Sequence, residues 1–289
     1  MAQPPAALVP RTPSMAPLRA PSMLFTLFGD YAYPSGRDIR LAALVTIGKA
    51  LGVSEVAVRS AVARLAREGW IAARRTSNRS HYGLSDAGRR LIDEGTQRIY
   101  RPWRGAWSGE WCVLNYSIPE TRRSERDRIR KQLAWLGFGA MGGGAYVSPR
   151  DVSAQAERLL QAHRLHRFAR VFRGRLTGPG TDADLASQCW DLRAIARRYE
   201  AFVRHYEPIH RRDTRLCRLG SLCDGDAFVT RFALTHDFRR FPFIDPDLPH
   251  HVLPRNWAGA RARSLFEKHH TLLTTLALRF FERVAGDRG

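Results

Sequence analysis

Residues 38–84, DIRLAALVTIGKALGVSEVAVRSAVARLAREGWIAARRTSNRSHYGL, decide the fold of the N-terminal part of this 289-residue chain. Apolar residues at helical spacing predict one helix that ends at Gly52 and a second that is capped by Ser54 and ends at Gly69. Two short strands then flank a polar turn at residues 76–79. Helix, turn, helix and basic hairpin, in this order, predict a winged helix-turn-helix.

The second helix of this motif has a buried and an exposed face. Ser54 is the predicted N-cap, because its hydroxyl can accept a bond from an unpaired backbone N–H of the first turn, and it is one of the predicted DNA-binding residues. The buried stripe consists of four apolar residues, Val58, Ala61, Val62 and Leu65. In such motifs the second helix enters the DNA major groove. We therefore predict that Arg59 and Ser60 lie near base edges and that Arg64 and Arg67 reach phosphates or solvent.

The hairpin that follows is basic. Its predicted DNA-binding residues are Arg74, Arg75, Asn78, Arg79 and His81. Such a wing typically binds phosphates or the minor groove and thereby sets the register of the protein on the duplex. A pair of helices with outward arginines is also a common solvated shape, and winged helices serve as protein-interaction modules too. The basic hairpin at the expected place favours DNA binding.

The charge of the whole chain points to a polyanionic partner. There are 47 Lys and Arg against 27 Asp and Glu, which gives a net charge of +20. A GC-rich genome could explain why almost all the cations are arginine, but not the net sign. Residues 181–289 carry 18 basic and 14 acidic residues, a net +4, so this last third is the least expected nucleic-acid surface.

Other features set limits on the class of protein. No apolar run approaches the roughly 20 residues of a membrane span. Residues 1–21 are rich in Pro and Ala without an apolar core, which predicts a disordered leader and not a secretory signal. A transit peptide would fit the composition alone. The four cysteines lack zinc spacing, so we expect free thiols in a reducing cytosol.

The rest of the chain predicts two further domains and an α+β fold. Ser22 is the predicted N-cap of a helix over 23–33. The order β-α-β-β-α-β predicts a ferredoxin-like middle domain, and one amphipathic helix over 182–209 opens a mainly helical C-terminal region. The predicted boundaries are a leader at 1–21, a winged helix-turn-helix at 22–103, the ferredoxin-like domain at 104–180, and a helical effector and dimerisation domain at 181–289.

No pattern of catalytic residues is present, so we expect neither an enzyme nor a cofactor or metal. The run Gly142-Gly-Gly144 lacks the Lys-Ser/Thr ending of a phosphate loop, and the adjacent His269 and His270 point to different helix faces. The alternative is a nucleic-acid-processing protein that uses its basic middle domain. That activity would need a carboxylate near the first strand, and residues 111–118 contain none.

Several strings together resemble one family. They are SMLFTLFGDYAYPSG, VSEVAVRSAVARLAREGW, RRTSNRSHYGLS, SERDRIRKQLAWLGFG and THDFRRFPFIDPDLPHHVLPRNWAGARARSLF. They resemble the PaaX family of bacterial transcriptional repressors over about residues 22–285. The resemblance implies a cytoplasmic, nucleoid-associated homodimer that binds operator DNA of an aromatic-acid operon, above all for phenylacetate. It also implies release by an aryl-CoA thioester such as phenylacetyl-CoA.

A CoA thioester needs cations for its phosphates and an aromatic slot for its acyl group. The candidate effector-binding residues lie within one short span, His236, Arg239, Arg240, Phe241 and Phe243. A structural role competes with this interpretation, since Arg239 could pair with Asp237 or Asp245 and lock the loop against the core.

Overall fold

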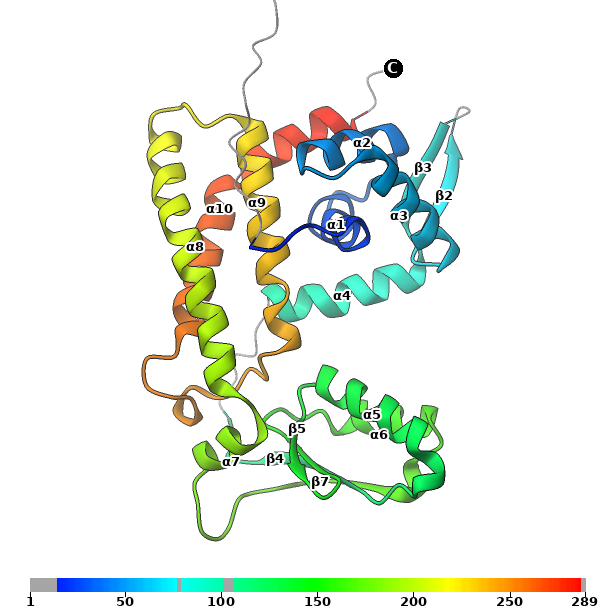
Figure 1. The fold of residues 1–289 in the computed structure, drawn as a ribbon, viewed down its shortest axis with the longest axis vertical. Coiled ribbons are helices and arrows are strands. Elements are labelled where there is room, and N and C mark those ends of the chain that lie inside the picture. The colour runs from blue at the N-terminus through cyan, green and yellow to red at the C-terminus, as the bar shows by residue number, and fades with distance from the viewer. Residues whose placement is uncertain (1–14, 77–78, 101–106, 287–289) are drawn as a thin grey trace, which may run out of the picture. The chain divides into compact units, whose positions relative to one another are not determined.

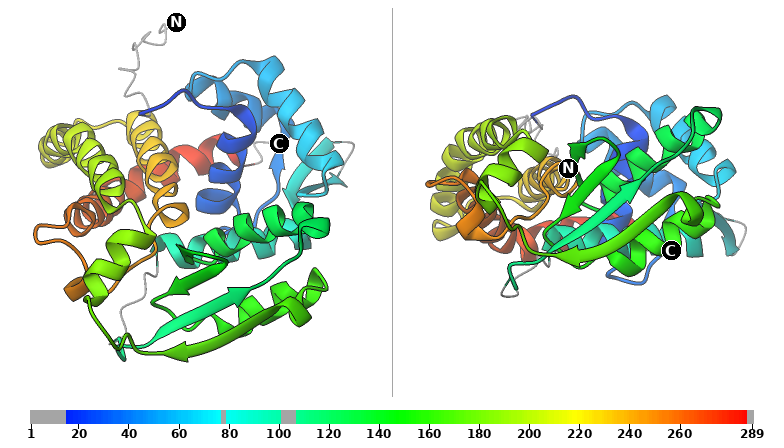
Figure 2. Two further views of the ribbon diagram at one scale, coloured as in Figure 1. Left: turned by 60° about the horizontal axis from the view of Figure 1, so that its bottom comes forward. Right: turned by 90° about the horizontal axis from the view of Figure 1, so that it is seen from below.

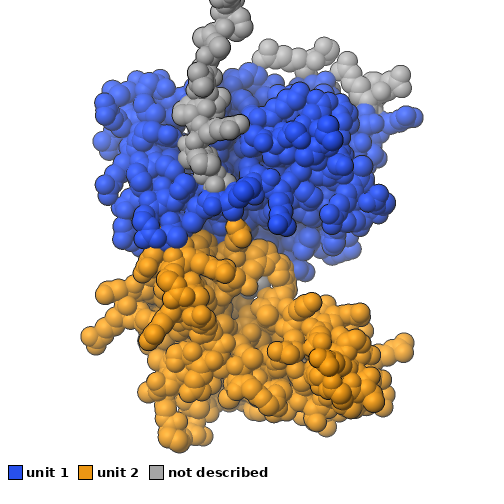
Figure 3. Space-filling model, in the orientation of Figure 1, with its two compact units in different colours: residues 1–100, 201–239, 260–289 blue, residues 101–200, 240–259 orange. Residues whose placement is uncertain are grey.

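The computed structural model describes residues 15–76, 79–100 and 107–286. The chain forms two compact units, which Figure 3 distinguishes. Unit 1 contains residues 1–100, 201–239 and 260–289, and unit 2 contains residues 101–200 and 240–259. Each unit thus joins segments that are far apart in the sequence. The consecutive domain boundaries given above stay a prediction.

The N-terminal part of unit 1 is the winged helix-turn-helix that the sequence predicted. Its elements are α1 Ala20–Leu27, a π-helical turn Phe28–Ala32, β1 Ile39–Arg40, α2 Leu41–Ala50, α3 Glu55–Arg67, β2 Ile71–Thr76, β3 Arg79–Leu84 and α4 Asp86–Tyr100. The three strands are antiparallel in the order β1-β3-β2. Gly52 and Gly69 follow α2 and α3 with φ of +78° and +77°, a region that glycine adopts without strain.

The first helix differs from its prediction. Ser22 is not its N-cap, because α1 already begins at Ala20 with Arg19 in the cap position. Pro21 fits the first turn, where its missing N–H would have no helical partner in any case. The hydroxyl and carbonyl of Ser22 accept hydrogen bonds from Arg239 instead. Residues 1–14 of the predicted leader lie outside the described residues.

The C-terminal helices of unit 1 are α8 Leu192–Arg218 from residue 201 onward, α9 Asp224–Phe238 and α10 Ala258–Ala285. Two of them, α9 and α10, share one core with the winged helix. In Figure 1, α1 lies between α3 and α9. Tyr31, fully buried, packs its ring 5.0 Å from that of Phe228 on α9 and 5.4 Å from that of Phe281 on α10. The DNA-binding motif is therefore built directly onto the C-terminal helices.

Unit 2 contains the predicted ferredoxin-like fold. Its elements are β4 Trp111–Tyr116, α5 Arg123–Trp135, β5 Gly139–Gly142, β6 Ala145–Ser148, α6 Ser153–Ala162 and β7 Ala169–Gly174. The antiparallel sheet has the order β5-β6-β4-β7, which Figure 2 shows from two sides. Leu114 on β4 shares a buried core with Leu133 on α5 and Leu160 on α6, so both helices cover one face.

The helix predicted over 182–209 is in fact two helices, α7 Asp182–Cys189 and α8. Trp190 is extended between them, with φ −137° and ψ 139°. Asp191 accepts a 2.8 Å hydrogen bond from the backbone N–H of Ala194 and so caps the start of α8. The loop after α9 forms a 3₁₀ turn at Phe241–Phe243. Further 3₁₀ turns lie at Glu120–Arg122, His166–Phe168 and His250–Val252.

Candidate DNA-binding surface

Helix α3 presents a polar face because its apolar stripe is buried. Val58, Ala61, Val62 and Leu65 are at most 3% exposed. The Oγ of Ser54 accepts from the backbone N–H of Ala57 at 3.3 Å, so the predicted N-cap is confirmed. Arg59, Ser60, Arg64 and Arg67 are all exposed on the opposite side. The helix therefore offers the residue types that the prediction places in a major groove.

Arg59 is held by a carboxylate near the start of the same helix. Its guanidinium contacts Oε1 of Glu55 at 2.9 Å, and Lys49 contacts Oε2 of the same carboxylate at 3.0 Å. These bonds, from Lys49 first and Arg59 second, hold the pKa of Glu55 below its usual value. Glu55 thus stays ionised and orients Arg59, but it also sets a negative charge where DNA phosphates would approach.

Two further features complete the exposed face of α3. Arg64 forms an ion pair with Glu68 at 2.7 Å, one turn further along. Val56 is 77% exposed, although an apolar side chain usually avoids water. The sequence reasoning missed Val56 because only the buried stripe was sought. In the sequence, Val56 could have been recognised as an apolar residue that does not belong to that stripe. An exposed apolar side chain of this kind can contact the methyl group of thymine.

The wing places its cations on two paired strands. Arg74 lies opposite His81 and Arg75 opposite Ser80 in the β2–β3 register, and both arginines are exposed. Arg74 also contacts Asp38 at 3.3 Å. His81 is partly buried, and its Nδ1 has no hydrogen-bond partner among the described residues. Arg79 begins β3, whereas Asn78 lies outside the described residues.

The base of the wing is fixed to α4. Ser85 donates from its hydroxyl to the carbonyl oxygens of Gly69 at 2.6 Å and Trp70 at 3.2 Å, and accepts from the backbone N–H of Gly88. A Cβ at Gly88 would lie 2.1 Å from the Trp70 carbonyl oxygen. The first turn of α4 therefore lies directly against the start of β2.

Two of the five candidate effector residues are bound to α1. His236 is buried, and its Nδ1 lies 2.8 Å from Oγ1 of Thr26. Arg239 donates to the carbonyl oxygen of Ser22 at 3.0 Å. Arg239 is therefore bonded to α1 through Ser22, a partner that the sequence did not indicate, and both the lock with Asp237 or Asp245 and the ligand contact stay predictions.

The other three candidates belong to unit 2. Arg240 is exposed, and the Phe241 ring stacks on Tyr199 with 3.9 Å between centroids and 9° between planes. Phe243 is 44% exposed and packs 4.5 Å from the Trp135 ring. His236 and Arg239 belong to unit 1, so neither unit by itself contains all five residues.

Two features of other classes of protein, a membrane-spanning helix and a metal-binding cluster, are not found in the part of the chain that the structure describes. None of its helices is long and apolar enough to cross a membrane. Its His, Cys, Asp and Glu side chains form no group of three or more that could hold a metal ion. His269 contacts Asp213 at 2.9 Å while His270 lies 3.5 Å from Asp30, so the adjacent histidines have different partners.

The capped helix α3, its outward arginines and the basic hairpin define a winged helix-turn-helix protein. Sequence profiles then identify the family. Residues 19–88 match the PaaX-like protein model, residues 104–186 the PaaX protein central Cas2-like domain, and residues 190–283 the PaaX-like protein C-terminal domain.

Two relatives extend this result over the whole chain. The transcriptional repressor PaaX of Escherichia coli (strain K12) is 31% identical over 270 residues, which cover 91% of this chain and 83% of that protein. The chain therefore belongs to the PaaX family of transcriptional repressors. The structure of the uncharacterised protein Rv0674 from Mycobacterium tuberculosis shares the fold, with a TM-score of 0.57 and 21% identity, over 90% of this chain and 96% of that one.

Proposed function

We propose that the protein represses an aromatic-acid catabolic operon of the phenylacetate type by binding operator DNA as a homodimer in the bacterial cytoplasm. In this proposal it regulates transcription and catalyses no reaction. The family membership supports repression, and the exposed face of α3 supports operator binding. The observation that carries the proposal is that the exposed face of α3 lies beside a basic wing. Both belong to a domain that shares its core with the C-terminal helices α9 and α10.

The residues have distinct roles in this proposal. Arg59 and Ser60 lie in the N-terminal half of α3 and read base edges, for which Arg is suited by its paired donors to guanine O6 and N7. Arg64 and Arg67 bind phosphates. The wing cations Arg74, Arg75 and Arg79, with Asn78 and His81, grip the backbone and fix register. Ser54 contributes by capping the helix, which aims its N-terminal turn at the groove.

Substitution of Arg59 tests operator binding. We expect Arg59→Ala to weaken specific binding about ten- to a hundred-fold, as loss of a bidentate base contact does, with a smaller effect on nonspecific DNA. Fluorescence anisotropy at several salt concentrations would measure both. The matched control is Arg128→Ala, an exposed arginine on α5. Unchanged operator binding by Arg59→Ala, or specific DNA cleavage by the wild type with Mg²⁺, would contradict the proposal.

We further propose that an aryl-CoA thioester, with phenylacetyl-CoA as the first choice, releases the protein from DNA. The resemblance to the family supports this step, and His236, Arg239, Arg240, Phe241 and Phe243 remain the predicted contacts. A true effector at 100 times its Kd should stabilise the fold by about 2.7 kcal/mol, whereas free CoA and phenylacetate should not. Thermal unfolding and operator release would be measured together, with sedimentation to establish the dimer.

A further inference from the structure

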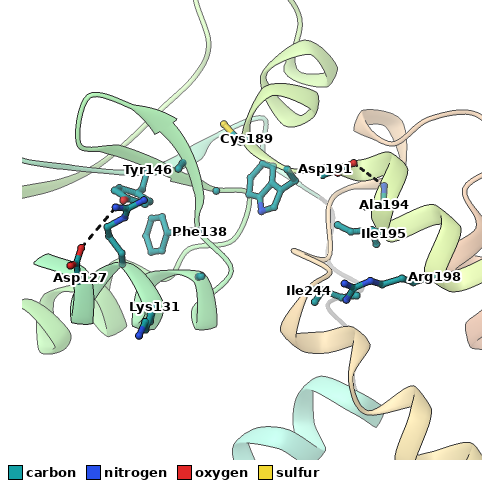
Figure 4. A pocket seen from close by; sticks show the side chains of 15 residues that line it. Asp127, Lys131, Phe138, Tyr146, Cys189, Asp191, Ala194, Ile195, Arg198 and Ile244 are labelled. Atoms are coloured by element: carbon teal, nitrogen blue, oxygen red, sulfur yellow. Dashed lines mark hydrogen bonds and ion pairs between the residues drawn. The ribbon is translucent and has the colours of Figure 1, made fainter. Parts of the chain in front are cut away.

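Unit 2 contains a cavity of about 760 Å³ that none of the predicted contacts lines. It lies between α5, β5, the first turns of α8 and Ile244 of the loop that follows α9. Figure 4 shows Lys131 and Phe138 on one side of it and Ile195, Arg198 and Ile244 on the other. The volume is within the range of about 300–1,000 Å³ that is typical of small-molecule sites.

The inner wall of the cavity is apolar and rigid. Phe138 and Ile195 are buried, and the Trp190 ring is held in place by stacking with Trp111 at 6.2 Å and 25°. A Cβ at Gly139 would lie only 2.6 Å from the Trp190 ring, so glycine lets the strand approach it closely. Burial raises the pKa of the Cys189 thiol to about 11, and the thiol therefore adds a neutral surface to this wall.

The rim of the cavity carries an excess of positive charge. Arg130 and Lys131 come from α5, and Arg198 comes from α8. The two acids of the lining are already engaged, since Asp127 lies 4.0 Å from Arg130 and Asp191 caps α8. In the described part of the chain, Lys131 and Arg198 are exposed and have no ion-pair or hydrogen-bond partner.

We propose that this cavity binds an organic anion that carries a flat apolar group. Lys131 and Arg198, on facing walls, bind its anionic groups, because two cations without partners favour a ligand of opposite charge. Phe138, Trp190 and Ile195 bind the apolar group. An aryl-CoA thioester has both features, so the inference deepens and rests on the proposed function, with a different place for the effector.

Besides Ile244, which lines the cavity, Tyr199 links the cavity to the aromatic loop of unit 2. Tyr199 follows Arg198 on α8, stacks on Phe241 and donates a 2.6 Å hydrogen bond to Asp245. A ligand that moves Arg198 therefore acts on the stack that holds Phe241. This contact gives Phe241, which does not line the cavity, a role in the response without direct contact with the ligand.

Calorimetric titration of the full chain tests the site with two probes, phenylacetyl-CoA and 8-anilinonaphthalene-1-sulfonate, an aromatic anion unrelated to CoA. Lys131→Gln combined with Arg198→Gln should weaken both by at least about ten-fold, the scale of losing charge-assisted bonds. Arg128→Gln and Arg197→Gln, exposed on the same two helices but outside the lining, are the matched controls. Ala134→Trp fills the cavity while its charges remain, and it should block both probes.

The outcomes separate the site from the proposed function. If both probes bind the double variant as tightly as the controls, or if neither binds the wild type, the cavity is not a ligand site. Charge-dependent binding of the sulfonate without binding of phenylacetyl-CoA would uphold the cavity and overturn the aryl-CoA effector. Equal release of wild type and double variant from DNA by phenylacetyl-CoA would uphold the effector and overturn the cavity.

Discussion

At the residue scale, we predict that Glu55 limits how strongly Arg59 binds DNA in the proposed complex. It accepts from both Lys49 and Arg59 at an exposed position, where an ion pair contributes little to folding. In the proposed complex its larger effect is on binding, because a carboxylate at the groove would repel phosphates and compete with them for Arg59. Helix α3 is therefore expected to bind less tightly than its arginines alone would allow.

We predict that Glu55→Gln binds operator DNA roughly two- to five-fold more tightly than the wild type, as removal of one weak exposed ion pair allows. The gain should shrink with added salt, because it is electrostatic. Anisotropy titrations at two salt concentrations would show it. Glu94→Gln removes the same charge from an exposed site on α4 and should change little. Weaker binding by Glu55→Gln would instead show that the carboxylate orients Arg59 productively.

The sequence predicted which residues of α3 are exposed but not their partners. Helical spacing alone places Arg59 and Ser60 outside the stripe of Val58, Ala61, Val62 and Leu65. Glu55 forms ion pairs with two cations because Lys49, which belongs to α2, reaches it across the turn between the helices. Such a contact is set by the angle between two helices, and spacing within one helix carries no information about that angle.

At the element scale, the wing depends on how α4 begins. Gly88 lets the first turn of α4 lie against the carbonyl of Trp70, at the start of β2. Helix propensity favours alanine over glycine by about 1 kcal/mol in a helix interior. Here the added methyl would meet backbone, which cannot move aside as a side chain can.

We predict that Gly88→Ala lowers the free energy of unfolding by about 1–3 kcal/mol, because overpacking outweighs propensity. Gly95→Ala on the same helix should raise it by up to about 1 kcal/mol, since a Cβ there meets no atom within 4 Å. Urea unfolding followed by circular dichroism would compare the two. Equal stabilisation by both substitutions would show that α4 does not press on the wing.

Element types were more predictable than element ends. The ferredoxin-like order and the hairpin follow from alternation and turn residues, which are local signals. The break at Trp190 was missed because the apolar spacing continues across it from Leu185 to Ile195. One extended residue followed by the Asp191 cap is enough to start a new helix. The periodicity of apolar residues cannot detect a break that involves a single residue.

At the scale of the whole molecule, segments from three parts of the chain meet around one buried charge in unit 1. Asp30, in the π-helical turn, accepts from Arg231 on α9 at 3.0 and 3.3 Å and from Tyr100 at the end of α4 at 2.7 Å. His270 on α10 lies 3.5 Å away. Nothing in the sequence around Asp30 indicates these partners, because each is 70 or more positions distant.

Asp30 thus joins the winged helix to the C-terminal helices, and its loss should be costly. Burial raises its pKa, but Arg231, His270 and Tyr100 more than offset this and hold the pKa below its usual value. Asp30 and Arg231 are only 7% and 5% exposed. We predict that Asp30→Asn lowers the free energy of unfolding by about 3–5 kcal/mol at pH 7, because it leaves Arg231 buried without a countercharge.

The same linkage fixes the sign of the pH dependence. A carboxylate whose pKa is lowered by folding contributes its full stabilisation above its unfolded pKa of about 4, and loses it as the pH falls through the lower folded value. The difference between wild type and Asp30→Asn should therefore be constant from pH 7 to about pH 5 and narrow below pH 4. Urea unfolding at each pH would measure it, with Asp93→Asn, at an exposed partner of Tyr33, as the control. A difference that does not change with pH down to 3 would mean that the charge of Asp30 is not what binds the winged helix to the helices behind it.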